Sequence, residues 1–131
     1  VRKFAMRFPN VKIVLDHCGF PDPAAFPDTF GFTTQHHSLS GHENVHFKFT
    51  SYLMFLSLDP AGIDLTGFMD YAADLYGAQQ MVWGSDFGNL QEDHFAYLQR
   101  ALDATAQMPY EARKAIFFDT AYKLFVPGGA R

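Results

Sequence analysis

Three short apolar segments, separated by helical or polar sequence, constrain the fold of this chain more than any other feature. Residues 11–15 form a largely β-branched run, residues 45–49 alternate apolar and polar side chains, and residues 81–83 read MVW. Near-continuous apolar runs are typical of strands in a parallel sheet, and alternation has the two-residue period of a strand. The three segments therefore predict three β-strands.

The segments between these strands predict helices. Apolar residues recur at helical spacing within residues 1–8, 60–76, 89–102 and 109–125, whereas residues 20–44 read as a long polar loop. Asp59 and Pro60 are expected to start the second helix and Gly77 to end it, while Asn89 and Glu92 resemble a capping box for the third. Strands that alternate with helices favour an α/β fold with parallel strands.

Composition narrows the classes of function. The 131 residues suit one domain, and a hydrophobic content of 48% supplies a core. A net charge of −4 without a basic run disfavours nucleic-acid binding. No apolar run approaches the roughly 20 residues that span a bilayer, so we expect no membrane partner. Cys18 is the single cysteine, which disfavours a disulfide framework and favours a cytoplasmic setting.

Two of the predicted strands run directly into polar residues with catalytic chemistry. Asp16 and His17 follow the first strand, and Ser85 and Asp86 follow the third. Ligands collect at the carboxyl ends of parallel strands, so His17 and Asp86 are expected to share one site. His17 could transfer protons or bind a metal, and Asp86 could bind a metal or take a proton from water. The alternative is a core histidine at 17 and a helix cap at 86.

Three motifs resemble consecutive strands of the amidohydrolase-related family. Residues 8–19 (FPNVKIVLDHCG) resemble its sixth-strand signature, residues 44–51 (NVHFKFTS) its seventh and residues 83–86 (WGSD) its eighth. The resemblance implies that residues 1–131 are the C-terminal portion of a (β/α)8 TIM barrel, comprising strands six to eight with their helices. A chain that begins at Val1, inside a predicted helix, fits this expectation.

The resemblance also implies a reaction. Its branch of the family hydrolyses cyclic lactones such as pyrone dicarboxylates, so the expected substrate is a small carboxylated lactone or a related C–O or C–N compound. Asp86 would activate water, bind a divalent metal (Zn or Mn), or both, and His17 would assist. The alternatives are a metal-dependent, non-oxidative decarboxylase and a non-catalytic α/β binding module. Lys48 matches a lysine common on the seventh strand, for which a structural role is favoured.

The part of the family pattern that this chain lacks leads to further expectations. No His-x-His pair is present, and a complete barrel needs about 250 residues. The chain alone is therefore expected to be inactive as a hydrolase, and unpaired strand edges favour self-association. The loop histidines His36, His37 and His42 are expected to be solvated rather than to bind a metal, and Cys18 is expected to be inert.

Overall fold

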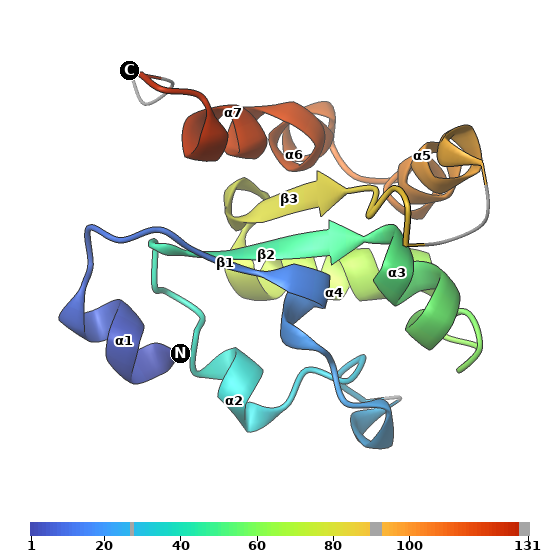
Figure 1. Cartoon of the computed structure of the whole chain (residues 1–131). Coiled ribbons are helices and arrows are strands. Elements are labelled where there is room, and N and C mark those ends of the chain that lie inside the picture. The colour runs from blue at the N-terminus through green and yellow to red at the C-terminus, as the bar shows by residue number, and fades with distance from the viewer. Residues whose placement is uncertain (27, 90–92, 129–131) are drawn as a thin grey trace.

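A parallel three-stranded sheet forms the centre of the molecule. The computed structural model describes residues 1–26, 28–89 and 93–128. Strands β1 (Ile13–Leu15), β2 (Val45–Thr50) and β3 (Met81–Gly84) lie in the order β1-β2-β3, and both pairs are parallel (Figure 1). The α/β fold with parallel strands is confirmed, and the predicted strand positions hold to within two residues.

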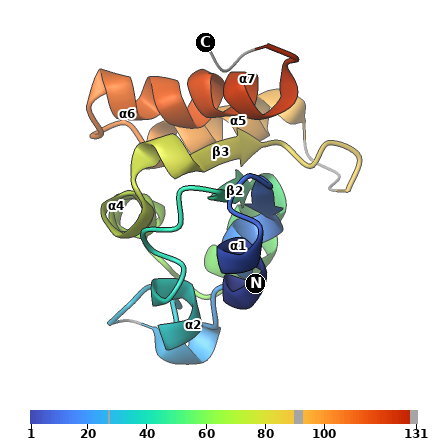
Figure 2. The ribbon, with the colours of Figure 1, turned by 90° about the vertical axis from the view of Figure 1, so that its left-hand side faces the viewer.

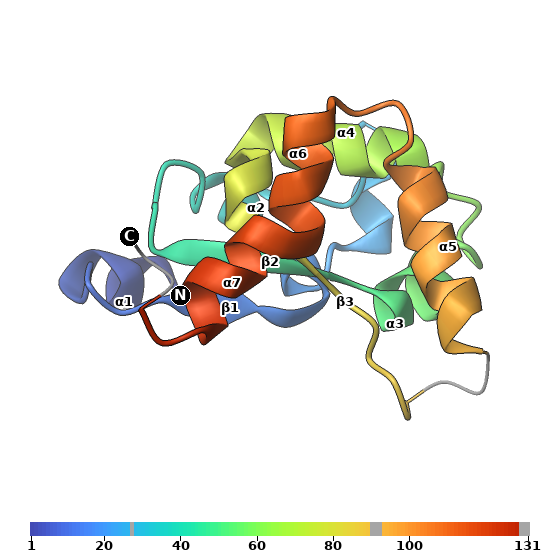
Figure 3. The same cartoon turned by 90° about the horizontal axis from the view of Figure 1, so that it is seen from above.

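Seven α-helices are present among the described residues, and no described helix is long and apolar enough to cross a membrane. The π-helical turn Ala115–Asp119 joins α6 to α7, so the predicted final helix is confirmed as one rod that lies over β3 (Figure 3). The helices are α1 (Arg2–Arg7), α2 (Thr34–His37), α3 (Ser51–Leu53), α4 (Leu65–Tyr76), α5 (His94–Ala104), α6 (Tyr110–Lys114) and α7 (Thr120–Phe125).

The predicted start of α4 is wrong. Asp59 lies at the end of a π-helical turn, Met54–Leu58, that continues α3. The N-cap of α4 is Asp64, whose carboxylate accepts hydrogen bonds from the backbone N–H groups of Thr66 and Gly67, both at 3.1 Å. Gly77 ends the helix as expected, with a φ of 87° that favours glycine.

Helix α5 also begins later than expected. Its N-cap is Asp93, whose carboxylate accepts a hydrogen bond from the Phe95 N–H at 3.3 Å. Asn89 therefore does not start the helix, and Glu92, its expected capping partner, lies outside the described residues.

The two adjacent loop histidines have structural partners, contrary to the expectation that they are solvated. His36 is buried, with Nε2 at 3.1 Å from the Gly19 carbonyl oxygen, and His37 Nε2 lies 2.9 Å from the Tyr71 hydroxyl. Residues 1–26, 28–89 and 93–128 contain no group of three or more His, Cys, Asp or Glu side chains that could hold a metal. Both histidines belong to the short helix α2, which lies within the segment that the sequence predicts to be a loop.

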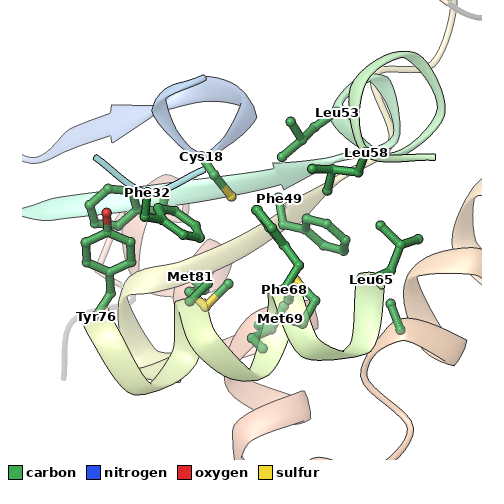
Figure 4. Close-up of a cluster of buried hydrophobic side chains, with 14 of the residues drawn as sticks. Cys18, Phe32, Phe49, Leu53, Leu58, Leu65, Phe68, Met69, Tyr76 and Met81 are labelled. Carbon is green, nitrogen blue, oxygen red and sulfur yellow. The ribbon is translucent and has the colours of Figure 1, made fainter. Parts of the chain in front are cut away.

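The main core lies between α4 and one face of the sheet (Figure 4), and the view in Figure 2 shows α4 beside the sheet. Phe68 on α4 is fully buried and stacks against Phe32 and Phe49, with ring centroids 5.1 Å and 6.2 Å apart. Successive side chains of a strand point to opposite faces, so Phe47 and Phe49 pack towards α4 while Lys48 points away. On β2 this alternation places His46, Lys48 and Thr50 on the other face.

Replacing Phe68 by alanine should lower the free energy of unfolding by about 3–5 kcal/mol, because the change leaves a cavity among packed aromatic rings. Urea unfolding monitored by circular dichroism would measure the loss. Phe95, which is 74% exposed, provides the matched control, and Phe95→Ala should change stability by no more than about 0.5 kcal/mol. Similar losses for the two variants would contradict the assigned core.

His46 should make the fold sensitive to acid. Burial, assisted by the charge of Lys12, lowers the pKa of His46 from 6.5 to about 4, and its buried Nδ1 has no hydrogen-bond partner among the described residues. The unfolded chain takes up this proton below about pH 6.5 but the folded chain does not, so stability should fall between pH 6.5 and 4. Urea unfolding across this range should show a shallower pH dependence for His46→Gln. Identical slopes for the two proteins would count against the buried neutral imidazole.

Candidate active site

The two residues predicted to share a site meet at the carboxyl edge of the sheet. His17 follows β1 and Asp86 follows β3, with β2 between the two strands. The His17 Nδ1 and the Asp86 Oδ2 nevertheless lie 3.5 Å apart. Parallel pairing brings these strand ends to the same edge, on the right in Figure 1. The geometry therefore brings together two side chains that are 69 positions apart in the sequence (86 − 17).

A left-handed turn presents His17 at this edge. The φ angles of His17, Cys18 and Phe20 are 53°, 51° and 59°, values that side chains other than glycine rarely adopt. The Phe20 N–H donates to the His17 carbonyl oxygen at 2.9 Å, and the Cys18 thiol donates to the Lys48 carbonyl at 3.7 Å. Strained turns of this kind persist where the surroundings hold them and are common at functional sites.

Thr50, the last residue of β2, orients the His17 ring. Its hydroxyl oxygen accepts a hydrogen bond from the Leu53 N–H at 3.2 Å and lies 2.7 Å from His17 Nδ1. A hydroxyl group has one hydrogen to donate and two lone pairs with which to accept, so it can bond to either tautomer of the imidazole. The rings of Phe20 and Tyr52 flank the imidazole, each with its centroid 4.8 Å away. His17 is therefore held at the surface of the site rather than packed in the core.

The Asp86 side chain is only 7% exposed, and its two oxygens differ in their surroundings. Oδ1 accepts a hydrogen bond from the Lys48 ammonium at 3.1 Å, whereas Oδ2 is buried and accepts none within the described chain. The helix-cap alternative for Asp86 is wrong, because Asp93 caps α5. A buried carboxylate oxygen without a donor calls for an explanation, and a role towards a bound molecule provides one.

Lys48, for which the sequence favours a structural role, lies between the two strand-end carboxylates. Its Nζ lies 3.0 Å from Asp16 Oδ1 and 3.1 Å from Asp86 Oδ1, so it bridges two carboxylates. Burial works to lower the pKa of Lys48, but the hydrogen bonds and charges of Asp16 and Asp86 outweigh it and raise that pKa. The side chain is therefore a charged ammonium. In the sequence, the position of Lys48 between Phe47 and Phe49 already indicates that its side chain lies on the face of β2 opposite the core.

Cys18 does not supply a nucleophile to this site. The residue is fully buried, and burial raises the pKa of its thiol well above the ordinary range. Because the thiolate is the reactive form, Cys18 remains an unreactive thiol in the folded chain.

The described residues do not by themselves build a metal centre. His17 and Asp86 are the two metal-type donors that converge most closely at this edge, and they belong to no larger group of such donors in the described ranges. The Lys48 ammonium already neutralises Asp86 Oδ1. Among the Asp86 oxygens, Oδ2 is therefore the one that could bind a divalent cation.

A cavity of about 440 Å³ opens beside the ion pairs. Val14, Val82 and Trp83 from the sheet and Ala121 and Phe125 from α7 form its apolar walls, and its charged groups are Asp16 and Lys48. An apolar pocket with few polar groups is the usual form of a small-molecule site.

Comparison with known proteins identifies relatives over nearly the whole chain. Residues 1–126 match the family described as amidohydrolase. L-fucono-1,5-lactonase from Burkholderia ambifaria is 30% identical over 84 residues, which are 64% of this chain and 29% of that protein.

Solved structures agree with this match at the level of the fold. An amidohydrolase from Burkholderia multivorans, solved with bound zinc, is 22% identical with a TM-score of 0.70, covering 94% of this chain and 46% of that one. A protein from Pseudomonas putida assigned as 2-pyrone-4,6-dicarboxylic acid hydrolase is 23% identical with a TM-score of 0.69, covering 99% and 50%. The chain thus spans about half the length of these solved relatives.

Replacing Thr50 by valine should release the His17 ring. The change removes the hydroxyl beside Nδ1 and the acceptor for the Leu53 N–H, and loss of such a cap costs about 0.5–2 kcal/mol. The ¹⁵N shifts of the His17 imidazole should change in Thr50→Val and stay unchanged in Thr50→Ser. Thr120→Val, which removes a hydroxyl hydrogen bond to the Gln79 carbonyl, provides a control that lowers stability without moving these shifts. Unaltered His17 shifts in Thr50→Val would show that Thr50 does not orient the ring.

Proposed function

Because this chain belongs to the amidohydrolase family, we propose that it is the C-terminal part of a (β/α)8-barrel hydrolase that opens small carboxylated lactones or related C–O or C–N compounds. In this proposal β1, β2 and β3 are barrel strands six, seven and eight. The parallel sheet and the coverage of about half of the solved relatives support the assignment. The similarity to a lactonase supports a lactone substrate, and the similarity to a protein assigned as a pyrone dicarboxylic acid hydrolase supports a carboxylated one.

The buried Oδ2 of Asp86, which accepts no hydrogen bond from the described residues, is the observation that carries the proposed chemistry. Lys48 occupies Oδ1, so Oδ2 is the oxygen free to take a proton from an attacking water molecule. The resulting hydroxide adds to the lactone carbonyl carbon, and the ring C–O bond then breaks to give a hydroxy acid. A carboxylate in this position acts as a general base.

His17 acts in the second step of the reaction, in which the C–O bond breaks. Its Nδ1 lies 3.5 Å from Asp86 Oδ2 and is held by Thr50. From this position the imidazole stabilises or protonates the substrate oxygen as the C–O bond breaks. Histidine suits this role because an imidazole can both donate and accept a proton.

We propose Asp86 as the contribution of this chain to any divalent-metal site in the whole protein. The zinc bound to the Burkholderia multivorans relative supports a metal in this fold, with Zn or Mn as the candidates here. When bound, such an ion lowers the pKa of water and polarises a carbonyl group. The described residues offer it Asp86 Oδ2 but do not complete its ligand set, so further ligands would have to come from other strands.

The alternative reactions make different demands on the same residues. A non-oxidative decarboxylase would hold its substrate through a metal at Asp86, whereas a hydrolase also needs a carboxylate oxygen that can take a proton from water, which Asp86 Oδ2 offers. The similarity to a lactonase favours hydrolysis. A non-catalytic binding module would not need a buried carboxylate oxygen without a donor.

The proposal also covers the cellular compartment of the protein and the self-association of the isolated chain. The single cysteine favours a cytoplasmic protein, because a reducing compartment keeps a lone thiol free. In the described sheet β1 and β3 each pair on one side only, so the isolated chain is proposed to self-associate through these edges.

Asp86→Asn in the full-length protein should lower the turnover of L-fucono-1,5-lactone or 2-pyrone-4,6-dicarboxylate, whichever it hydrolyses, by at least about 10²–10⁴-fold. Asparagine keeps the shape but removes the base. Asp93→Asn is the matched control, because asparagine caps a helix as well as aspartate does and the rate should be retained. Near-wild-type turnover by a stable Asp86→Asn variant would remove the proposed base.

The assay should record both the hydroxy acid and carbon dioxide, since release of carbon dioxide would identify the decarboxylase instead. The 131-residue chain should show no turnover, because two catalytic groups without their partners lose orientation that can be worth roughly 7–11 kcal/mol.

A further inference from the structure

Lys48 holds two carboxylates of different character. Asp86 is buried, with its side chain 7% exposed, whereas the Asp16 side chain is 60% exposed. Ion pairs with exposed groups contribute little stability, since water and salt replace them readily. The bond from Lys48 to Asp16 is therefore the one that another anion can displace.

The structure fixes the position of the Lys48 ammonium. The lysine stem crosses β3 at Gly84, where an added Cβ would lie 2.3 Å from Lys48 Cε. A larger residue at position 84 would push the end of the lysine stem aside. The carboxylates of Asp16 and Asp86 hold the ammonium, so it is an ordered cation rather than a mobile surface charge.

The cavity beside Lys48 suits the rest of a small organic anion. Its volume of about 440 Å³ falls within the range of roughly 300–1,000 Å³ that is typical of ligand pockets. Val82, Trp83 and Phe125 offer apolar contacts to a carbon ring. Asp16 and Lys48 are its charged lining residues, and they carry opposite charges.

We propose that Lys48 binds the carboxylate of the substrate and that Asp16 occupies this position when no ligand is bound. The ring of the ligand then packs against Trp83 and Phe125. Its carboxylate binds the Lys48 ammonium at the position that Asp16 occupies in the absence of ligand, while Asp86 keeps its own contact with the ammonium. The inference rests on the proposed function for the identity of the ligand as substrate. It adds a specificity-determining residue, since an uncharged lactone would leave the Lys48–Asp16 pair in place.

Trp83, the single tryptophan of the chain, lines the cavity and reports on its contents by fluorescence. Titration of the 131-residue chain with cyclohexanecarboxylate should change this fluorescence saturably, and cyclohexanecarboxamide, which is uncharged, should bind far more weakly. Lys48→Met should weaken carboxylate binding by about 10-fold or more, as expected for loss of a charge-assisted hydrogen bond. Lys48→Arg should restore most of the affinity, and Lys123→Met, a change at an exposed lysine on α7, should have no effect.

Asp16→Asn separates displacement from a merely structural ion pair. If Asp16 competes with the ligand, this variant should bind cyclohexanecarboxylate several-fold more tightly and cyclohexanecarboxamide with unchanged affinity. If Asp16 only positions Lys48, carboxylate affinity should fall. Unchanged or weaker carboxylate binding by Asp16→Asn, or wild-type affinity in Lys48→Met with a native circular dichroism spectrum, would overturn the proposal. Binding needs no turnover, so this result is independent of the Asp86 rate measurement.

Discussion

Parallel pairing of β2 with both of its neighbours is the constraint on which the rest of the structure depends. Only with all three strands running in one direction do Asp16, Thr50 and Asp86 end at the same edge. The register of the strands then determines which side chains lie on each face of the sheet. Phe47 and Phe49 turn towards α4 and form the core, while Lys48 turns to the opposite face and reaches the strand ends. Core and site are thus two consequences of one pairing pattern.

Charge and strain are concentrated at that edge. A lysine between two aspartates keeps a buried carboxylate tolerable, since an unpaired buried charge would be costly. Next to it, Asp86 itself adopts a φ of 50°, and the turn that carries His17 is left-handed over several residues. Such conformations are held only where surrounding contacts determine them, and here Thr50 and the carbonyl oxygen of Lys48 supply those contacts.

The sequence predicted the elements whose signal is local. Apolar runs placed all three strands, Gly77 marked the end of α4, and polar residues after two strands located His17 and Asp86. The start of α4 was missed because Asp59 and Asp64 are both plausible caps, and only the chain path through the π-helical turn decides between them. The contacts of Lys48 with Asp16 and Asp86 could not be predicted, because no local pattern contains the relative positions of those carboxylates. His36 and His37 were misread for the same reason.

The shape of the cavity wall formed by α7 depends on the number of residues in the π-helical turn between α6 and α7. A π turn holds one residue more than an α turn, and each residue rotates an α-helix by about 100°. The direction in which Ala121 and Phe125 face is therefore set by the number of residues between positions 115 and 119 as well as by their identity. Evolution could change the shape of this pocket by adding or deleting a single codon there, while every lining side chain stayed the same.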